Sequence, residues 1–311
     1  MSSKANPFVI LTAVALGLGG GLYFSHQSPS APLAVLSPTQ ANARFHSPNA
    51  SNVSIELKDE EDSLSERERT GLRDMVSKQL LFHQHQTQIP NPLTLRIKLF
   101  KREADYLAYQ REHSKTTSPK GYYSTRRKEL VVNKSRQTYG KTLKHEAQHF
   151  LLRLNGFSRP PRWINEGLSE CFEEMSIDAS NKAWMHRQDW RMKRLQGWQA
   201  QGQLPSVSDF VNWSRDTWST SGKKTPYLNQ SMAWALVYFL METPTGRYTL
   251  IQTLKDLRAK KYDGNSARII DAYYPLNALE RDFNTFLEAI PTRLPFRFDG
   301  PEEGLFPASS R

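Results

Sequence analysis

Cysteine is almost absent from this chain of 311 residues, because Cys171 is the only one. A single cysteine cannot form an intrachain disulfide, and it says nothing about the redox compartment. The sequence also lacks internal repeats, a glycine-rich phosphate loop and a serine nucleophile elbow. The usual signatures of repeat proteins, phosphate-loop enzymes and Ser-His-Asp hydrolases are therefore missing. We expect Cys171 to pack inside the protein rather than to act as a nucleophile.

Acidic residues are fewer than basic ones: the chain has 42 Lys and Arg but 31 Asp and Glu, which gives a net charge of +11. The basic residues are scattered in short clusters such as Arg126-Arg127-Lys128 and Lys223-Lys224, and no nucleic-acid motif accompanies them. We therefore expect no nucleic-acid partner, and we favour a solvated basic face near anionic lipid. A hydrophobic content of 38% suffices for a sizeable core and argues against a disordered protein.

One long apolar run occurs, Phe8–Phe24, and Lys4 precedes it. Its length suits a minimal membrane span, so residues 1–25 are predicted to form an uncleaved signal anchor. The positive charge before it favours a cytoplasmic N-terminus with the rest translocated, into the periplasm if the cell is bacterial. Ala41-Asn42-Ala43 resembles a cleavage site but lies far beyond the apolar run. Cleavage there would give a secreted protein, whereas the uncleaved segment would bind the membrane.

Composition divides the rest of the chain. Residues 26–51 are rich in Ser, Pro, Ala and Asn and read as a flexible linker. Residues 52–294 are expected to form one globular domain, followed by a Pro- and Gly-containing tail at 295–311.

Within the domain, periodicity predicts an α+β fold with a small mixed sheet and a mainly helical C-terminal part. Strands are expected at 53–57, 93–100, 121–124 and 129–133, and helices at 65–82 and 103–112. Further helices are expected at 189–200, from 205, at 227–241, 248–260 and 276–290, with a polar loop at 219–226. His83 and His85, near the end of the first helix, are interpreted as solvated rather than metal-bound.

The stretch 139–175 contains a His-Glu-x-x-His motif formed by His145, Glu146 and His149. The surrounding apolar residues repeat at three and four positions, which indicates a helix that ends at Asn155-Gly156. On a helix, the two histidines share one face one turn apart and can both reach a tetrahedral zinc ion. Glu146 can then act on a zinc-bound water as general base.

A catalytic zinc site needs a third protein ligand and an open position for water. Glu166 lies in Trp-Ile-Asn-Glu-Gly, early in a second predicted helix, and sixteen residues separate it from His149. This distance allows the first helix to end and an antiparallel neighbour to offer a carboxylate. Glu170 lies one turn further on the same face, so it is either a rival ligand or a hydrogen-bond partner for a histidine N–H.

The pairing of HEAQH with WINEGLSECFE resembles the gluzincin zinc metallopeptidases, in particular the bacterial peptidase MA-like family. The resemblance covers roughly residues 93–240. It implies a thermolysin-like catalytic core in which His145, His149 and Glu166 bind one Zn²⁺ and Glu146 activates water. The Ser169-Glu170-Cys171-Phe172 stretch departs from the usual pattern of that family, which leaves the role of Glu170 open.

Two further features follow from the resemblance. Gluzincins use the strand before the zinc helix as an edge that pairs with extended substrate, which assigns residues 121–125 to the rim of the cleft. An ordinary hairpin with surface tyrosines is the alternative. Many gluzincins also place a tyrosine downstream as an oxyanion partner, and Tyr227, sixty-one positions after Glu166, is the candidate, with Tyr122 and Tyr123 as alternatives.

These features together predict a zinc-dependent hydrolase, a metallopeptidase acting on a peptide or protein substrate. The competing interpretation is a membrane-tethered, non-catalytic binding module on the same scaffold. The sequence does not separate an aminopeptidase from an endopeptidase, because no motif for a free amine is present.

Overall fold

The computed structural model describes residues 53–86, 93–115, 117–157, 159–178, 182–259, 261–288 and 296–298. The chain divides into two units, Met1–Ser47 and Pro48–Arg311, and all described residues belong to the second. The predicted anchor Phe8–Phe24 and linker 26–51 lie outside the described residues. Among the helices that are described, none is long and apolar enough to cross a membrane.

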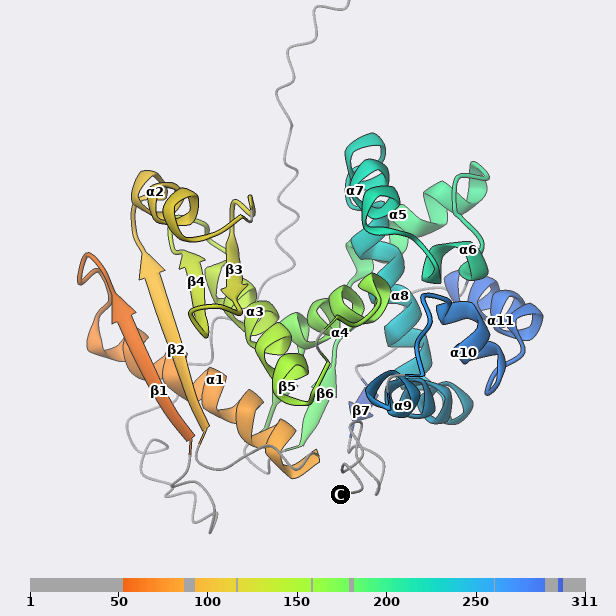
Figure 1. The fold of residues 1–311 in the computed structure, drawn as a ribbon, viewed down its shortest axis with the longest axis horizontal. Coiled ribbons are helices and arrows are strands. Elements are labelled where there is room, and N and C mark those ends of the chain that lie inside the picture. The colour runs from red at the N-terminus through yellow and green to blue at the C-terminus, as the bar shows by residue number, and fades with distance from the viewer. Residues whose placement is uncertain are drawn as a thin grey trace, which may run out of the picture. The chain divides into compact units, whose positions relative to one another are not determined.

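Helices and strands follow one another through the described unit (Figure 1). The helices are α1 Glu66–Gln86, α2 Glu103–His113, α3 Tyr139–Leu154, α4 Arg162–Glu174, α5 Asp189–Ala200, α6 Val207–Val211, α7 Arg215–Lys224, α8 Leu228–Glu242, α9 Pro244–Arg258, α10 Ser266–Asp271 and α11 Leu276–Glu288. The strands are β1 Val53–Asp59, β2 Leu93–Phe100, β3 Gly121–Ser124, β4 Glu129–Asn133, β5 Ser176–Ile177, β6 Ala183–Met185 and β7 Phe296–Phe298. The α+β class, with its small mixed sheet, is confirmed.

The first sheet has the strand order β1-β2-β4-β3. β1, β2 and β4 are parallel neighbours, whereas β3 runs antiparallel to β4 and forms an edge. Alternation along β2 places its leucines and Ile97 on the face covered by α1 and α3, while Phe100 joins Tyr106 of α2 in a separate cluster. The two faces of the sheet are therefore covered by different helices.

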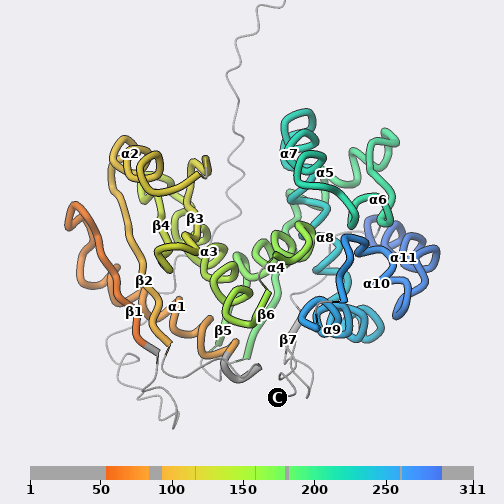
Figure 2. The backbone as a smooth tube through the Cα atoms, viewed as in Figure 1, coloured from red at the N-terminus to blue at the C-terminus, as the bar shows by residue number. Residues whose placement is uncertain are grey.

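α3 and α4 lie side by side and connect the sheet to the helical part of the chain (Figure 2). Gly156 allows the turn after α3, because its φ of 87° lies in the left-handed region. α4 packs closely on α8, an almost wholly buried helix, in the cluster that also holds the C-terminal helices. The predicted α3 and α4 segments are both confirmed as helices.

Gly167 sets the distance between α4 and α8. A Cβ at this position would lie 2.5 Å from the carbonyl oxygen of Ala233 and 2.5 Å from a side-chain carbon of Val237. No larger residue fits without moving one helix away from the other. This explains why glycine follows Glu166 directly, since any shift of α4 would also move that carboxylate.

Gly167→Ala is therefore expected to lower the free energy of unfolding by about 1–3 kcal/mol through overpacking. The matched control is Gly71→Ala, in the interior of α1, where a Cβ would meet nothing within 4 Å. There the same substitution should raise stability by about 0.5–1 kcal/mol, because it restricts the unfolded chain. Urea unfolding of both variants measures the difference, and a shift of equal sign would contradict the packing argument.

Several predicted elements need correction. Residues 219–226 were expected to form a polar loop, but most of them belong to α7, which begins at a Ser214 cap and buries Trp218. His83 was expected to be solvated, but it is fully buried and its ring lies tilted against that of Phe172, with 4.7 Å between centroids. Phe296–Phe298 of the predicted tail form β7, which pairs with β6, and this does not contradict a tail at 295–311. The short α10, β5 and β6 were not predicted.

Candidate metal centre

α3 presents His145 and His149 one turn apart on the same face. Their ring centroids are 4.8 Å apart, with the rings nearly perpendicular. The opposite stripe of α3, with Leu143, Ala147 and Leu151, is buried under the sheet. This packing fixes the rotation of the helix about its axis, and it leaves the two imidazoles mostly buried but facing α4.

Glu166 of α4 lies against both imidazoles. Its Oε2 atom is 3.6 Å from Nε2 of His145 and 3.8 Å from Nε2 of His149. Glu146 lies beside the same group: His145, Glu146 and His149 each offer a potential ligand atom, and these atoms lie within 4.8 Å of one another. The residues that the sequence predicted as a set are thus brought together by two helices.

His145, His149 and Glu166 are each held by a further partner on α4. Nδ1 of His145 lies 3.3 Å from a carboxylate oxygen of Glu173, and Nδ1 of His149 lies 3.1 Å from the Ser169 hydroxyl. The other oxygen of Glu166, Oε1, accepts hydrogen bonds from Arg162 at 3.0 Å and Asn165 at 3.1 Å. These contacts leave Nε2 of both histidines and Oε2 of Glu166 facing one another.

Glu173 was missed by the sequence analysis, which considered Glu170 as the partner of a histidine N–H. Glu170 forms a buried ion pair with Arg191 of α5 instead, although it remains in a cluster with His145 and Glu173. The available signal was spacing: Glu166 and Glu173 are seven residues apart, two helical turns, and so lie on one face. The prediction extended one turn beyond Glu166, to Glu170, and not two turns, to Glu173.

The edge strand β3 reaches Glu146. The backbone N–H of Tyr123 donates a hydrogen bond to the Glu146 carboxylate. β3 can approach α3 this closely because Gly121 has no side chain: a Cβ there would lie 2.7 Å from a methyl carbon of Thr142. The predicted rim strand is therefore an edge strand that lies directly beside the candidate general base.

Burial and charge shift the pKa values of these groups in different directions. Burial raises the pKa of Glu146 to about 7, against the opposing effect of His145. Burial lowers the pKa of His149 to about 4, so this imidazole is neutral near pH 7. For His145 burial also acts downward, but the carboxylates of Glu166 and Glu173 outweigh it and raise the pKa well above its usual value. The carboxylates thus favour a positive charge at the centre of the group.

The three tyrosines considered for an oxyanion lie in different places. Tyr122 points to the α2 face of the sheet, in the cluster with Phe100 and Tyr106. The Tyr123 ring packs on Phe150, with 5.6 Å between centroids, so only its backbone reaches Glu146. Tyr227 immediately precedes α8, whereas the predicted helix began at this residue; it is 39% exposed and its ring contacts Trp190.

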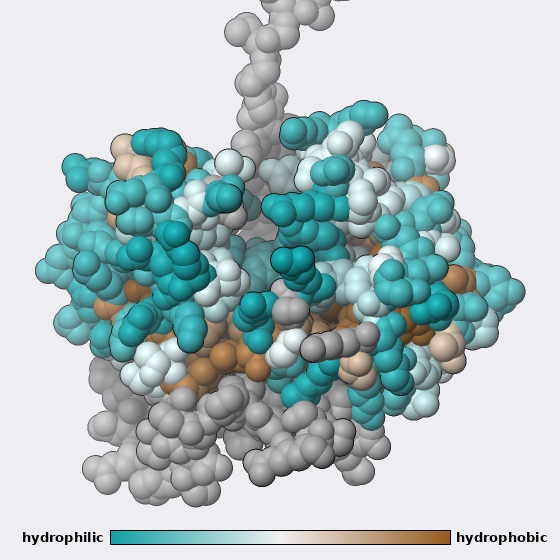
Figure 3. Space-filling view, viewed as in Figure 1, coloured by the Kyte–Doolittle hydropathy of each residue, from teal (hydrophilic) through white to brown (hydrophobic). Residues whose placement is uncertain are grey.

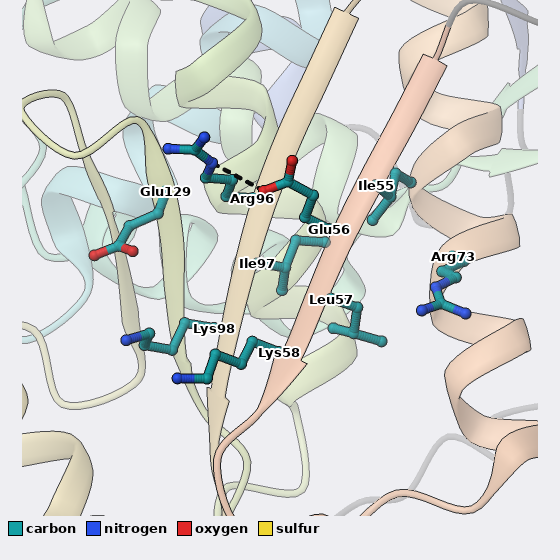
Figure 4. A pocket seen from close by; sticks show the side chains of 9 residues that line it. All are labelled: Ile55, Glu56, Leu57, Lys58, Arg73, Arg96, Ile97, Lys98 and Glu129. Carbon is teal, nitrogen blue, oxygen red and sulfur yellow. Dashed lines mark hydrogen bonds and ion pairs between the residues drawn. The ribbon is translucent and has the colours of Figure 1, made fainter.

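A separate groove follows β1 and β2 away from these residues (Figure 4). Its rim carries Glu56, which pairs with Arg96 at 2.9 Å, together with Lys58 and Lys98. Alternating charges of this kind protect an exposed sheet edge from pairing with another chain. The groove contains none of the candidate metal ligands, and we assign no chemistry to it.

Glu173→Gln is expected to weaken metal binding about 10–100-fold, because a carboxylate partner orients and polarises a ligating imidazole. The adjacent Glu174→Gln is the matched control, since Glu174 pairs with Lys141 rather than with a histidine. Competition with a chromophoric zinc chelator measures both affinities. Equal affinities for the two variants would remove Glu173 from the site.

Residues 140–261, from the first turn of α3 to just beyond α9, match a family model described as "Protein of unknown function (DUF1570)". The matched span includes His145, Glu146, His149 and Glu166, whereas the sheet with β3 lies before it. The description names no activity. No curated protein matches the chain.

Proposed function

We propose that this protein is a zinc-dependent peptidase with a thermolysin-like arrangement of its catalytic residues. His145, His149 and Glu166 would hold one Zn²⁺, and Glu146 would act as general base. The observation that carries the proposal is the position of Glu166 Oε2, 3.6 Å and 3.8 Å from the two Nε2 atoms.

The donor set fits this ion. Zinc binds imidazole and carboxylate at about 2.0–2.2 Å in tetrahedral geometry, which requires ligand atoms roughly 3.3–3.6 Å apart. The Glu166 oxygen lies 3.6 Å and 3.8 Å from the two imidazole nitrogens, at and just beyond the upper end of that range. Zinc-binding histidines also donate their second N–H to a fixed acceptor, and the Glu173 carboxylate and Ser169 hydroxyl occupy those positions. Three protein ligands leave one position open, which is typical of catalytic rather than structural zinc.

The chemistry would divide between the ion and Glu146. A bound Zn²⁺ polarises a carbonyl and lowers the pKa of a water molecule at its open position. Glu146 would take a proton from the attacking water and deliver it to the leaving amine. Burial raises the pKa of this carboxyl in the metal-free protein, the direction expected for a group that must both accept and donate a proton. The Tyr123 N–H would hold the carboxylate in place between these transfers.

β3 supports a peptide rather than a small-molecule substrate. It is an edge strand that an extended peptide could join, although the N–H groups of Gly121 and Tyr123 already contact Ser118 and Glu146. Because the same strand contacts Glu146, a peptide added to this edge would run past the candidate metal centre. The oxyanion role of Tyr227 stays a prediction, as does a membrane anchor that would place the domain outside the cytoplasm.

The proposal is tested by metal analysis of the purified full-length protein together with digestion of a peptide library. We expect about one zinc per chain, loss of cleavage on chelation, and recovery when zinc is restored. A protein that binds peptides but carries no zinc and cleaves none would instead be the non-catalytic module.

A further inference from the structure

An exposed arginine is clamped between two exposed aromatic rings. Trp190 of α5 is 45% exposed and Tyr227 is 39% exposed, and their rings meet edge to face with 6.1 Å between centroids. The guanidinium carbon of Arg194 lies 5.4 Å from the Trp190 centroid and 5.0 Å from that of Tyr227. Cation–π contacts to two rings restrict a side chain that would otherwise be mobile.

The backbone of Tyr227 is held in an unusual conformation. Its φ of 72° lies in the left-handed region, which bulky residues rarely adopt. Such a conformation persists only where the surrounding structure imposes it. Here it accompanies the position from which the Tyr227 ring contacts both Trp190 and Arg194.

Arg194 differs from the two preceding arginines in having no acidic partner. Arg187 pairs with Asp189, and Arg191 pairs with Glu170. Within the part of the chain that the structure describes, Arg194 forms no ion pair, although its side chain is exposed. Its guanidinium edge is therefore available to a carboxylate, which it can bind through two parallel hydrogen bonds.

The helix that carries Trp190 and Arg194 is attached to α4, which supplies Glu166 to the candidate metal centre. Arg191, next to Trp190, pairs with Glu170, one turn after Glu166 on α4. Gln188 accepts a hydrogen bond from Arg191 and donates one to the backbone carbonyl of Glu170. The start of α5 is thus fixed to the helix that supplies a candidate ligand, and the face in Figure 3 is hollowed between the side of β3 and the side of α5 and α7.

We infer that Arg194 is a specificity residue that binds a carboxylate of the substrate, while Trp190 and Tyr227 contact the adjacent part of the peptide. The carboxylate is an acidic side chain or the C-terminal carboxylate. The inference rests on the proposed peptidase function, because it assigns a substrate class to the same site. The excess of basic residues in the chain favours acidic peptides in general. The Arg194 guanidinium would determine at which position of the peptide the carboxylate is bound.

Binding without turnover tests this inference. The full-length Glu146→Gln protein is titrated with two peptide pools that differ only in a fixed central Glu or Gln, each with a free or an amidated C-terminus. We expect the pool that carries the recognised carboxylate to lose about tenfold or more in affinity when Arg194→Gln is added. The pool lacking it should be unaffected, and the Glu/Gln and free/amidated comparisons identify which carboxylate is bound.

Lys193→Gln is the matched control, because it removes the same charge from the adjacent exposed residue. It should leave the preference between pools unchanged, whereas Arg194→Lys should restore it only in part, since lysine lacks the bidentate fork. An unchanged preference in Arg194→Gln overturns the inference, even if the wild type cleaves peptides. Conversely, a preference that depends on Arg194 in a protein that cleaves nothing supports the binding site and rejects the proposed peptidase.

Discussion

Glu146→Gln is expected to abolish peptide hydrolysis while zinc binding is retained. Glutamine matches the shape of glutamate but cannot accept a proton, and removal of a general base typically costs about 10²–10⁴ in rate. The amide can still accept the hydrogen bond from the Tyr123 N–H, so the strand and the helix should remain in contact. The loss is measured as kcat/KM on a cleaved peptide, alongside the zinc content of the same preparation.

Glu112→Gln serves as the control, because its side chain is 74% exposed on α2, away from the site. It should leave both activity and zinc content unchanged. If the Glu146→Gln protein cleaved peptides as fast as the wild type, the metal centre would not be the source of the activity. If it lost its zinc as well, Glu146 would be acting as a ligand rather than as a base.

Arg191→Met is expected to destabilise the protein by about 3–5 kcal/mol, the usual cost of leaving a buried charge without its partner. Arg191 and Glu170 are each only 5% exposed, and they join α5 to α4. Burial already raises the pKa of Glu170, and loss of the guanidinium would raise it further. The folded variant then binds more protons than the unfolded chain, so its stability should fall as the pH rises. Urea unfolding at pH 5 and pH 8 measures both effects.

The double substitution Glu170→Met/Arg191→Met separates the charge from the packing. Replacing both partners of a buried ion pair by apolar residues is often nearly neutral, so the double variant should recover much of the stability lost in Arg191→Met. Arg281→Met removes an arginine that is 70% exposed and should cost no more than about 1 kcal/mol. A double variant as unstable as the single one would show that the loss comes from packing against Trp190 instead.

The sequence predicted the elements whose patterns are set locally. β2 alternates as far as Leu99, and the α3 stripe repeats at three and four positions, because each packs most of its apolar residues on one core. α7 could not be read this way. Its residues are polar, and it is held by the Ser214 cap and by Trp218, which packs on Phe210 and Trp213. Such anchoring depends on residues that come together only in the folded chain.

The candidate site was predicted in its ligands but not in their supports. His145, Glu146 and His149 form a motif with fixed spacing, and Glu166 follows at a distance that two helices can bridge. Spacing on α4 places both Glu170 and Glu173 on the face of Glu166, and it does not decide which of the two is the partner of His145. Glu170 pairs with Arg191 instead of with His145. Arg191 belongs to α5, and no sequence signal links that helix to the site. Burial of His83 likewise depends on Phe172, eighty-nine positions later.

The two helices that carry the candidate ligands belong largely to different hydrophobic clusters. Most of the apolar stripe of α3 packs under the sheet, whereas α4 packs with α8 and the C-terminal helices. An ion bound between the two helices would link the two hydrophobic clusters. Without the ion, each cluster could open locally without the other. Occupancy of the site by a metal ion would then govern how readily the two clusters open independently, and a metal-free protein would be the easier target for cellular proteolysis.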